Sequence, residues 1–179
     1  MPTPASAVVG CRVARSLEVA VADPQSASLE SLIEEKRRLV VSSMASYVPN
    51  ELLSRLVDQR LCSVEFVLND YVQFRFDGEQ GPGHVTLNSH VWPVVRQNGR
   101  QWREQDLRYA DALRRLDQGT VVSTTEKTGS GIRVDLDAGT IVIHPAKEEI
   151  FVEIAELSGF PDGRWMAWRP GEDSFEDLA

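Results

Sequence analysis

The stretch Gly131-Ile-Arg-Val-Asp-Leu-Asp-Ala-Gly139, followed directly by Thr140-Ile-Val-Ile-His144, alternates apolar and polar residues on both sides of an Ala-Gly pair. Such alternation predicts two half-buried strands joined by a tight turn. The stretch Tyr71-Val-Gln-Phe-Arg-Phe-Asp-Gly78, which a glycine-rich loop connects to Val85-Thr-Leu-Asn-Ser89, repeats the same design. The chain therefore contains one β-unit twice, and neither copy carries a catalytic signature.

A further predicted strand precedes each β-unit. Residues 61–68 alternate in the same way ahead of the first unit, and the Thr- and Val-rich run Thr120–Glu126 lies ahead of the second. Each copy is then a three-stranded meander, and we place the two meander repeats at residues 61–93 and 119–145. The third strand of the first repeat is expected to span Val85–Trp92, because Pro93 would end it.

Two helices accompany these strands. Apolar residues recur at three- and four-residue steps over residues 28–48, which predicts an amphipathic helix. Residues 104–117 begin with acidic side chains, end with Arg114 and Arg115, and are followed by Gly119, as is typical of a helix. More strands are expected over residues 150–155 and 164–168. The predicted fold class is α+β, a curved antiparallel sheet or open barrel built from two related β-meanders, with two covering helices.

The chain divides into three expected parts. Residues 1–27, rich in Pro, Ser and Ala, are read as a flexible N-terminal arm, and residues 28–48 as the amphipathic helix. Residues 50–179 form the β-rich domain, which ends in an acidic C-terminal tail. The Leu29–Tyr47 helix is expected to cover the sheet, or else to pair with a second copy of the chain or with a partner protein. Translation from Met44 would remove the arm and most of this helix but leave the β-domain whole.

The net charge of −8 is confined to the end of the chain. Residues 134–179 contain eleven acidic and three basic side chains, whereas the rest of the chain sums to zero. This acidic end would repel the phosphates of a nucleic acid, so we expect no nucleic-acid partner. It would attract a basic protein, because complementary charges steer association. The alternative is that the acidic residues serve solubility alone.

The composition also indicates in which cellular compartment the protein is expected. The chain is 42% apolar, but no apolar run is long enough to span a membrane, and the N-terminus lacks the basic and apolar regions of a signal peptide. We therefore expect a cytoplasmic protein without a membrane partner. Cys11 and Cys62 lack metal-ligand spacing and are expected to be reduced, buried residues.

Polar residues that could support chemistry are few. His90 and His144 lie at corresponding ends of the third strands of the two repeats, so with Asp135 they could line a ligand-binding or enzymatic pocket. Asp135 and Asp137 share one face of a strand but are more simply explained as a solvated surface. The sequence predicts no catalytic residue, metal site or cofactor, and it favours a non-enzymatic protein.

The final third also resembles a known group of proteins. The run Gly163-Arg-Trp-Met-Ala-Trp-Arg-Pro-Gly-Glu-Asp-Ser-Phe-Glu-Asp-Leu178, together with the Gly131–Pro145 meander, is similar to small uncharacterised bacterial proteins, many actinobacterial. Some of these resemble immunity proteins encoded beside secreted toxins. The resemblance implies a cytoplasmic protein without enzymatic activity that neutralises a toxin. Independently of the resemblance, the acidic C-terminal surface is what a binder of a basic toxin would carry.

The residues predicted to bind the partner combine this acidic surface with two tryptophans. Trp165 and Trp168 are three apart, so in a strand one of them would be exposed and could anchor an interface. The predicted partner-binding residues are Glu148, Glu149, Glu153, Glu156, Trp165, Trp168, Glu172, Asp173, Glu176 and Asp177.

Overall fold

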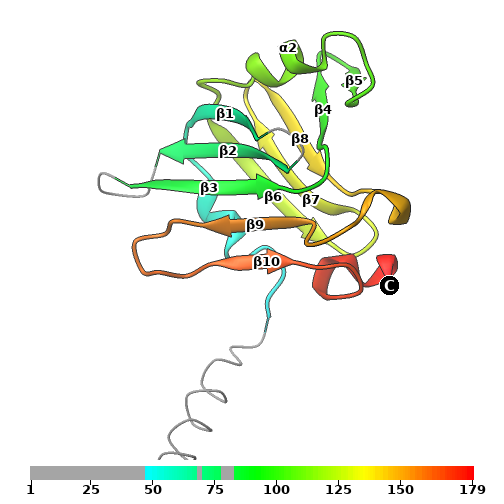
Figure 1. The fold of residues 1–179 in the computed structure, drawn as a ribbon. Coiled ribbons are helices and arrows are strands. Elements are labelled where there is room, and N and C mark those ends of the chain that lie inside the picture. Colours follow the sequence, from blue (N-terminus) through cyan, green and yellow to red (C-terminus); the bar gives the residue numbers. More distant parts are fainter. Residues whose placement is uncertain (1–46, 68–69, 78–82) are drawn as a thin grey trace, which may run out of the picture. The chain divides into compact units, whose positions relative to one another are not determined.

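The computed structural model describes residues 47–67, 70–77 and 83–179, which form two five-stranded antiparallel sheets (Figure 1). The first sheet has the order β1 (Leu61–Val67), β2 (Tyr71–Asp77), β3 (His84–Ser89), β9 (Ala155–Ser158) and β10 (Met166–Trp168). The second has the order β5 (Arg100–Trp102), β4 (Val94–Gln97), β8 (Gly139–Ile143), β7 (Gly131–Leu136) and β6 (Val121–Lys127). The predicted β-rich α+β fold is confirmed at this level. The strands form two sheets, however, and neither sheet closes into a barrel.

Helices are a minor part of the described chain. They are η1 (Leu53–Leu56), α2 (Tyr109–Arg114), η2 (Lys147–Glu149) and η3 (Asp173–Leu178), of which only α2 is an α-helix. Within the described residues, no helix is both long and apolar enough to cross a membrane. The predicted arm, Met44, Cys11 and most of the helix at residues 28–48 lie outside the described residues. Tyr47 and Val48, the described end of that helix, are not helical.

The two predicted meanders are present, but the hairpin after each meander joins the sheet of the other. The hairpin β4–β5 comes directly after β3 in the chain, yet β4 pairs with β8 in the other sheet. The hairpin β9–β10 comes after β8, yet β9 pairs with β3. Each sheet therefore consists of the meander of one repeat and the hairpin of the other, so neither repeat could form its sheet alone.

An approximate two-fold axis relates the repeats, and it passes between Arg60 and Thr120, which form an isolated antiparallel bridge. The hydrogen bonds around this bridge occur in matching pairs. Leu61 N donates to Gly119 O at 2.8 Å, and Val121 N donates to Gln59 O at 2.9 Å. Matching residue numbers thus differ by 60, as in Arg60 and Thr120.

Backbone irregularities obey the same relationship. A β-bulge interrupts β1 between Leu61 and Ser63, and another interrupts β6 between Val121 and Ser123. Asp58 and Gln118, each three residues before the start of its strand, have left-handed φ angles of 68° and 66°. Such φ angles are unusual for residues other than glycine, so their repetition shows that both entry turns have the same geometry.

The core lies on the inner faces of the two sheets, and matching positions in both repeats contribute to it. Buried side chains bring about 1.5–3 kcal/mol each relative to exposure, so this duplicated set dominates stability. The matching buried pairs are Leu53 and Leu113, Leu56 and Leu116, Leu61 and Val121, Val72 and Ile132, Phe74 and Val134, and Phe76 and Leu136.

Three predicted elements differ from the structure. The helix expected over residues 104–117 is reduced to α2, because the Asp106 carboxylate accepts the Arg103 N–H at 2.8 Å and Arg108 is left-handed. The third strand of the first repeat ends at Ser89, whose hydroxyl donates to Val91 O at 2.6 Å and bends the chain. The strand expected over residues 150–155 is wrong as well, since β9 begins only at Ala155.

Candidate functional site

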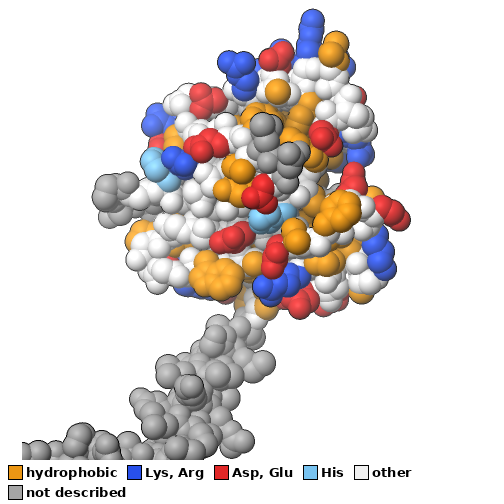
Figure 2. Space-filling model, in the orientation of Figure 1, with side chains coloured by type: hydrophobic (Ala, Val, Ile, Leu, Met, Phe, Trp, Pro, Cys, Tyr) orange, Lys and Arg blue, Asp and Glu red, His pale blue; other side chains and the backbone are white. Residues whose placement is uncertain are grey.

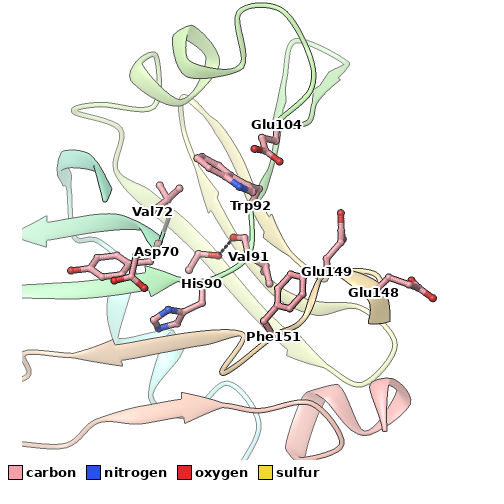
Figure 3. Close-up of a pocket in the computed structure, with 11 residues that line it drawn as sticks. Asp70, Val72, His90, Val91, Trp92, Glu104, Glu148, Glu149 and Phe151 are labelled. Atoms are coloured by element: carbon pink, nitrogen blue, oxygen red, sulfur yellow. Dashed lines mark hydrogen bonds between the residues drawn. The ribbon is translucent and has the colours of Figure 1, made fainter. Parts of the chain in front are cut away.

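A hollow of about 500 Å³ lies beside the carboxyl end of β3. Figure 2 shows hydrophobic and acidic side chains intermixed on this face of the molecule, and Figure 3 shows the residues that line the hollow. They come from the start of β2, the β3–β4 connection, the segment after β5 and the η2–β9 segment. We call this hollow the acidic concavity. Its acidic and aromatic lining residues are Asp70, Glu104, Glu148, Glu149, Tyr71, His90, Trp92 and Phe151.

The β3–β4 connection places His90 and Trp92 in the concavity. His90 N donates to Ile154 O at 3.0 Å, which fixes the connection to the segment before β9. The buried Tyr109 hydroxyl donates to Pro93 O at 2.6 Å and so ties the same connection to α2. The Trp92 ring then lies edge-on to Tyr109, with ring centroids 6.0 Å apart. These contacts hold the Trp92 ring in place although it is 44% exposed.

The η2–β9 segment supplies Phe151, whose side chain is 90% exposed. The Glu149 carboxylate accepts the Ala146 N–H at 2.7 Å, which closes the single turn of η2. Ile154 N then donates to Trp168 O at 2.8 Å, just ahead of β9. Between these two fixed points the chain bends and turns both Phe151 and Val152 outward. A largely exposed phenylalanine and a half-exposed tryptophan that line one hollow have the composition of a binding surface rather than of a solvated loop.

The charge around these rings is uniformly negative. Four carboxylates line the concavity, and no described lining residue is Lys or Arg. The neighbouring Lys147 is engaged elsewhere, because its Nζ donates to the backbone oxygen of Ala179. Figure 3 shows Glu104 above Trp92 and Glu149 beside Phe151, whereas Glu148 lies farther from the rings, so two of the carboxylates border the rings. The combination of ring faces and carboxylates suits a cationic group, which both attract.

A second hollow of about 540 Å³ occupies the corresponding end of the second repeat, and its charge is opposite. It is lined by Arg96, Arg103 and Arg133, together with Asp135 and His144. We call it the basic concavity. Matching residues of β3 and β8 differ by 54, because the turn before β8 is shorter, so His144 corresponds to His90. The two repeats therefore present similar hollows with different chemistry.

His90 and His144 have different partners. The His90 ring lies edge-on to Tyr71, with centroids 5.6 Å apart. The His144 Nε2 is 3.0 Å from Asp177 Oδ2, and its ring stacks on Phe175. Partial burial alone would raise the pKa of the Asp177 carboxyl. Hydrogen bonding, chiefly from His144, outweighs this effect and lowers that pKa. The C-terminal η3 thereby closes over His144, whereas His90 faces the acidic concavity.

The predicted pocket of His90, His144 and Asp135 is not formed. His90 lines the acidic concavity, while the other two line the basic one. Burial alone would raise the pKa of Asp135, but hydrogen bonds from Arg133, Thr140 and Ser123 occupy its carboxylate and lower that pKa. These three residues are therefore not arranged for joint catalysis or ligand binding.

The predicted partner-binding residues lie in several places. Glu148 and Glu149 line the acidic concavity, and Trp165 is 63% exposed outside it. Trp168 is fully buried and its Nε1 donates to Glu126 at 2.5 Å, so it belongs to the core and cannot anchor a partner. Glu153 pairs with Arg169 at 3.4 Å. The remaining predicted acids are Glu156 on β9, exposed Glu172 just before η3, and Asp173, Glu176 and Asp177 on η3.

Sequence reasoning missed several residues of the concavity, namely Asp70, Tyr71, Glu104 and Phe151. The consecutive apolar residues Phe151 and Val152 after two glutamates were the available signal, but β-branched neighbours favoured a strand there. Comparison with protein-family models, curated proteins and solved structures finds no match to the chain.

Proposed function

We propose that the domain is a non-enzymatic binding module that engages a basic segment of a partner protein in the acidic concavity. The observation that carries this proposal is the exposed Phe151 ring, which shares one hollow with Trp92 and four carboxylates. No cationic side chain among the described lining residues competes for those carboxylates. An arginine or lysine of the partner would supply the missing charge.

The rings and the carboxylates have different tasks in this proposal. Burying an exposed phenylalanine brings about 2 kcal/mol, and a cation over an aromatic face brings about 0.5–1 kcal/mol more at an exposed site. An exposed ion pair brings only about 0–1 kcal/mol. The rings therefore provide most of the affinity, while the carboxylates select a basic partner and accelerate its approach.

The chemistry of the lining residues supports binding rather than catalysis. The one serine in the concavity, Ser89, is buried and its hydroxyl already donates to Val91 O at 2.6 Å. It is thus held as a structural donor and is not paired with a base. His90 contacts the Tyr71 ring, which cannot activate it as a general base.

The acidic C-terminal residues lie outside the acidic concavity, before and on η3, and add negative charge to the surface of the same domain. Exposed Glu172 and Glu176 lie at the end of the chain, and Glu148 and Glu149 lie in the concavity itself. A basic secreted toxin, the partner class that the sequence resemblance implies, would be attracted by this distribution of charge. The proposal therefore keeps an immunity-type role as its specific form, with the concavity as the contact point.

Affinity capture with the tagged full chain tests the proposal. Lysate proteins are captured at low salt and at about 1 M salt, where the Debye length falls to about 3 Å. We expect one basic protein to be retained at low salt and lost at high salt. Phe151→Ala should reduce its retention roughly tenfold or more, since the ring is the main anchor.

Matched variants separate the concavity from the rest of the surface. Trp165→Ala removes an exposed aromatic side chain outside the concavity and should leave capture unchanged. Glu104→Gln with Glu148→Gln should weaken capture, whereas Glu172→Gln with Glu176→Gln alters the net charge equally and should matter less. Equal capture by wild type and Phe151→Ala, or loss with Trp165→Ala alone, would contradict the proposal.

A further inference from the structure

Three residues with metal-binding side chains meet at the opposite end of the first sheet from the acidic concavity. Cys62 comes from β1, Asp77 from the end of β2 and His84 from the start of β3. One donor atom from each side chain lies within 4.8 Å of the other two. Asp77 and His84 are direct partners in the β2–β3 register, so the backbone itself holds two of the three donors side by side.

The bulge in β1 brings the third donor to them. The register shift between Leu61 and Ser63 leaves Cys62 as the extra residue, and bulges of this kind redirect a side chain. Cys62 Sγ consequently lies 3.7 Å from His84 Nδ1 and 3.1 Å from Arg75 O, to which the thiol donates. Cys62 is a free, half-buried thiol, so its sulfur is available to an ion.

The separation of sulfur and nitrogen fits a bound ion. Zinc binds thiolate sulfur at about 2.3 Å and imidazole nitrogen at about 2.0–2.1 Å in tetrahedral sites, which places the two ligand atoms roughly 3.6 Å apart. The observed distance of 3.7 Å matches this edge of the tetrahedron, so the sulfur and the nitrogen already have the spacing of two zinc ligands. An ordinary hydrogen bond between thiol and imidazole could have a similar length, and a titration with metal ions distinguishes the two.

The carboxylate is oriented by a neighbour. Arg60 Nη2 lies 2.8 Å from Asp77 Oδ2, and Arg60 Nε lies 3.0 Å from the same oxygen. Asp77 Oδ1 is therefore the oxygen left to an ion, and Arg60 acts as the outer partner that often orients a metal-binding carboxylate. The arginine charge also weakens the attraction for a cation, so the site would be a moderate rather than a very tight one.

The second repeat shows that these donors are not required by the fold. Its bulge places Val122 where the first repeat has Cys62, and its register places Ala138 where the first has His84. Asp137 corresponds to Asp77, and its Oδ1 accepts the Thr120 N–H at 3.0 Å. The bulge and the aspartate are thus common to both repeats, whereas the thiol and the imidazole occur in the first alone.

We propose that Cys62, Asp77 and His84 form a binding site for a zinc-class divalent cation, with solvent in the fourth position. A mixed set of sulfur, nitrogen and oxygen donors suits zinc, whereas magnesium and calcium prefer oxygen ligands alone. The bound ion would join three adjacent strands at the end of the sheet. Burial and the nearby Asp77 raise the pKa of the Cys62 thiol, so binding releases the thiol proton to solvent.

Cobalt and zinc titrations of the purified full chain test this site. Cobalt should bind at one ion per chain and give the intense near-ultraviolet band of a cobalt–thiolate bond. Zinc should displace it and raise the midpoint of thermal unfolding in a concentration-dependent way. Zinc affinity is measured by competition with a chromophoric chelator.

Variants that carry the residues of the second repeat separate a loss of metal binding from a loss of folding. Cys62→Val and His84→Ala install the residues found at the matching positions, so both should fold, as circular dichroism would verify. Each should weaken zinc binding roughly tenfold or more, and Cys62→Val should abolish the cobalt–thiolate band. Two control variants, Cys11→Ser and His90→Ala, should bind zinc as the wild type does. Cys11 lies outside the described residues, and His90 lies at the other end of the first sheet. Absence of the band in wild type, or its persistence in Cys62→Val, would overturn the proposal.

Discussion

The two repeats share the arrangement of their strands but differ in the charge of the hollows on their surfaces. Buried positions match in type, as Leu53 does with Leu113 and Phe76 with Leu136. Exposed positions do not match, because the hollow beside His90 is lined by carboxylates and aromatic rings and the hollow beside His144 by arginines. Packing therefore explains what the repeats share, and recognition is to be sought where they differ.

At one buried position, the two repeats do not match in residue type. Glu126 in β6 is 6% exposed, whereas the matching residue of β1, Phe66, is 37% exposed. The Glu126 carboxylate accepts hydrogen bonds from the Trp168 indole and from Asn50 N at 2.7 Å, and also from Tyr47 and Ser174. It connects β6 to the start of the described chain, to β10 and to η3, so the second repeat depends on a polar centre that the first lacks.

Replacing this carboxylate should have the largest effect on stability. Glu126→Ala would leave several buried donors without an acceptor, at about 1–3 kcal/mol for each, so we expect a loss of about 3 kcal/mol or more. Phe66→Ala, at the matching position, should cost less, about 1–2 kcal/mol, because the Phe66 ring is already 37% exposed. Urea denaturation of both variants measures the difference, and equal losses would show that Glu126 is not the centre of this network.

A glycine marks the next difference between the repeats. Gly131 in β7 matches Tyr71 in β2 but has a φ of +65°, and a Cβ there would lie 2.2 Å from Ile143 O. Gly131→Ala should therefore cost about 2–3 kcal/mol, from the left-handed backbone and the steric clash together. Gly129 has a φ of +75° with open space around an added Cβ, so Gly129→Ala isolates the backbone effect and should cost about 1 kcal/mol. Urea denaturation of the two variants measures both losses, and a Gly131→Ala loss no larger than that of Gly129→Ala would contradict the predicted clash.

The hydrogen bond between His144 and Asp177 should give the smallest effect on stability, and this effect depends on pH. The folded-state pKa of Asp177 lies below its unfolded value, so its contribution to stability is present above the unfolded pKa. That contribution is lost as pH falls through the folded pKa. Asp177→Asn should be less stable than wild type near neutral pH, and the two should converge at acidic pH. Denaturation curves at a series of pH values test this, and a constant difference would contradict it.

Part of this architecture could be predicted from the sequence. The alternation around Tyr71–Asp77 and Gly131–Leu136 identified both meanders, because strand periodicity is a local property. The exchange of β4–β5 and β9–β10 between sheets could not be predicted, since the alternation of a strand carries no information on which distant strand it joins. The equivalent entry turns at Asp58 and Gln118 likewise have no shared residue type.

Of the candidate site, the sequence predicted the negative charge and the pocket position of His90, but not the exposed aromatic rings. The excess of acids identified Glu148 and Glu149, because net charge is a property of composition. Either Trp165 or Trp168 was predicted to be the exposed anchor, and Trp165 is the exposed one. The burial of Trp168 could not be predicted locally, because its hydrogen-bonding partner Glu126 lies 42 positions away in the chain. Phe151 was assigned to a strand, and its exposure depends on the hydrogen bond between Ile154 and Trp168 that ends the bend.

The central claim is that the acidic concavity, and not the basic one, receives a cationic group. Its most direct test is an NMR titration of the full chain with an arginine-rich peptide, with the same peptide carrying citrulline in place of arginine as control. We predict that the resonances of Trp92, His90 and Phe151 shift with the arginine peptide alone, and that those of His144 and Arg133 do not. Shifts centred on the basic concavity, equal shifts with citrulline, or no shifts at all would contradict the account.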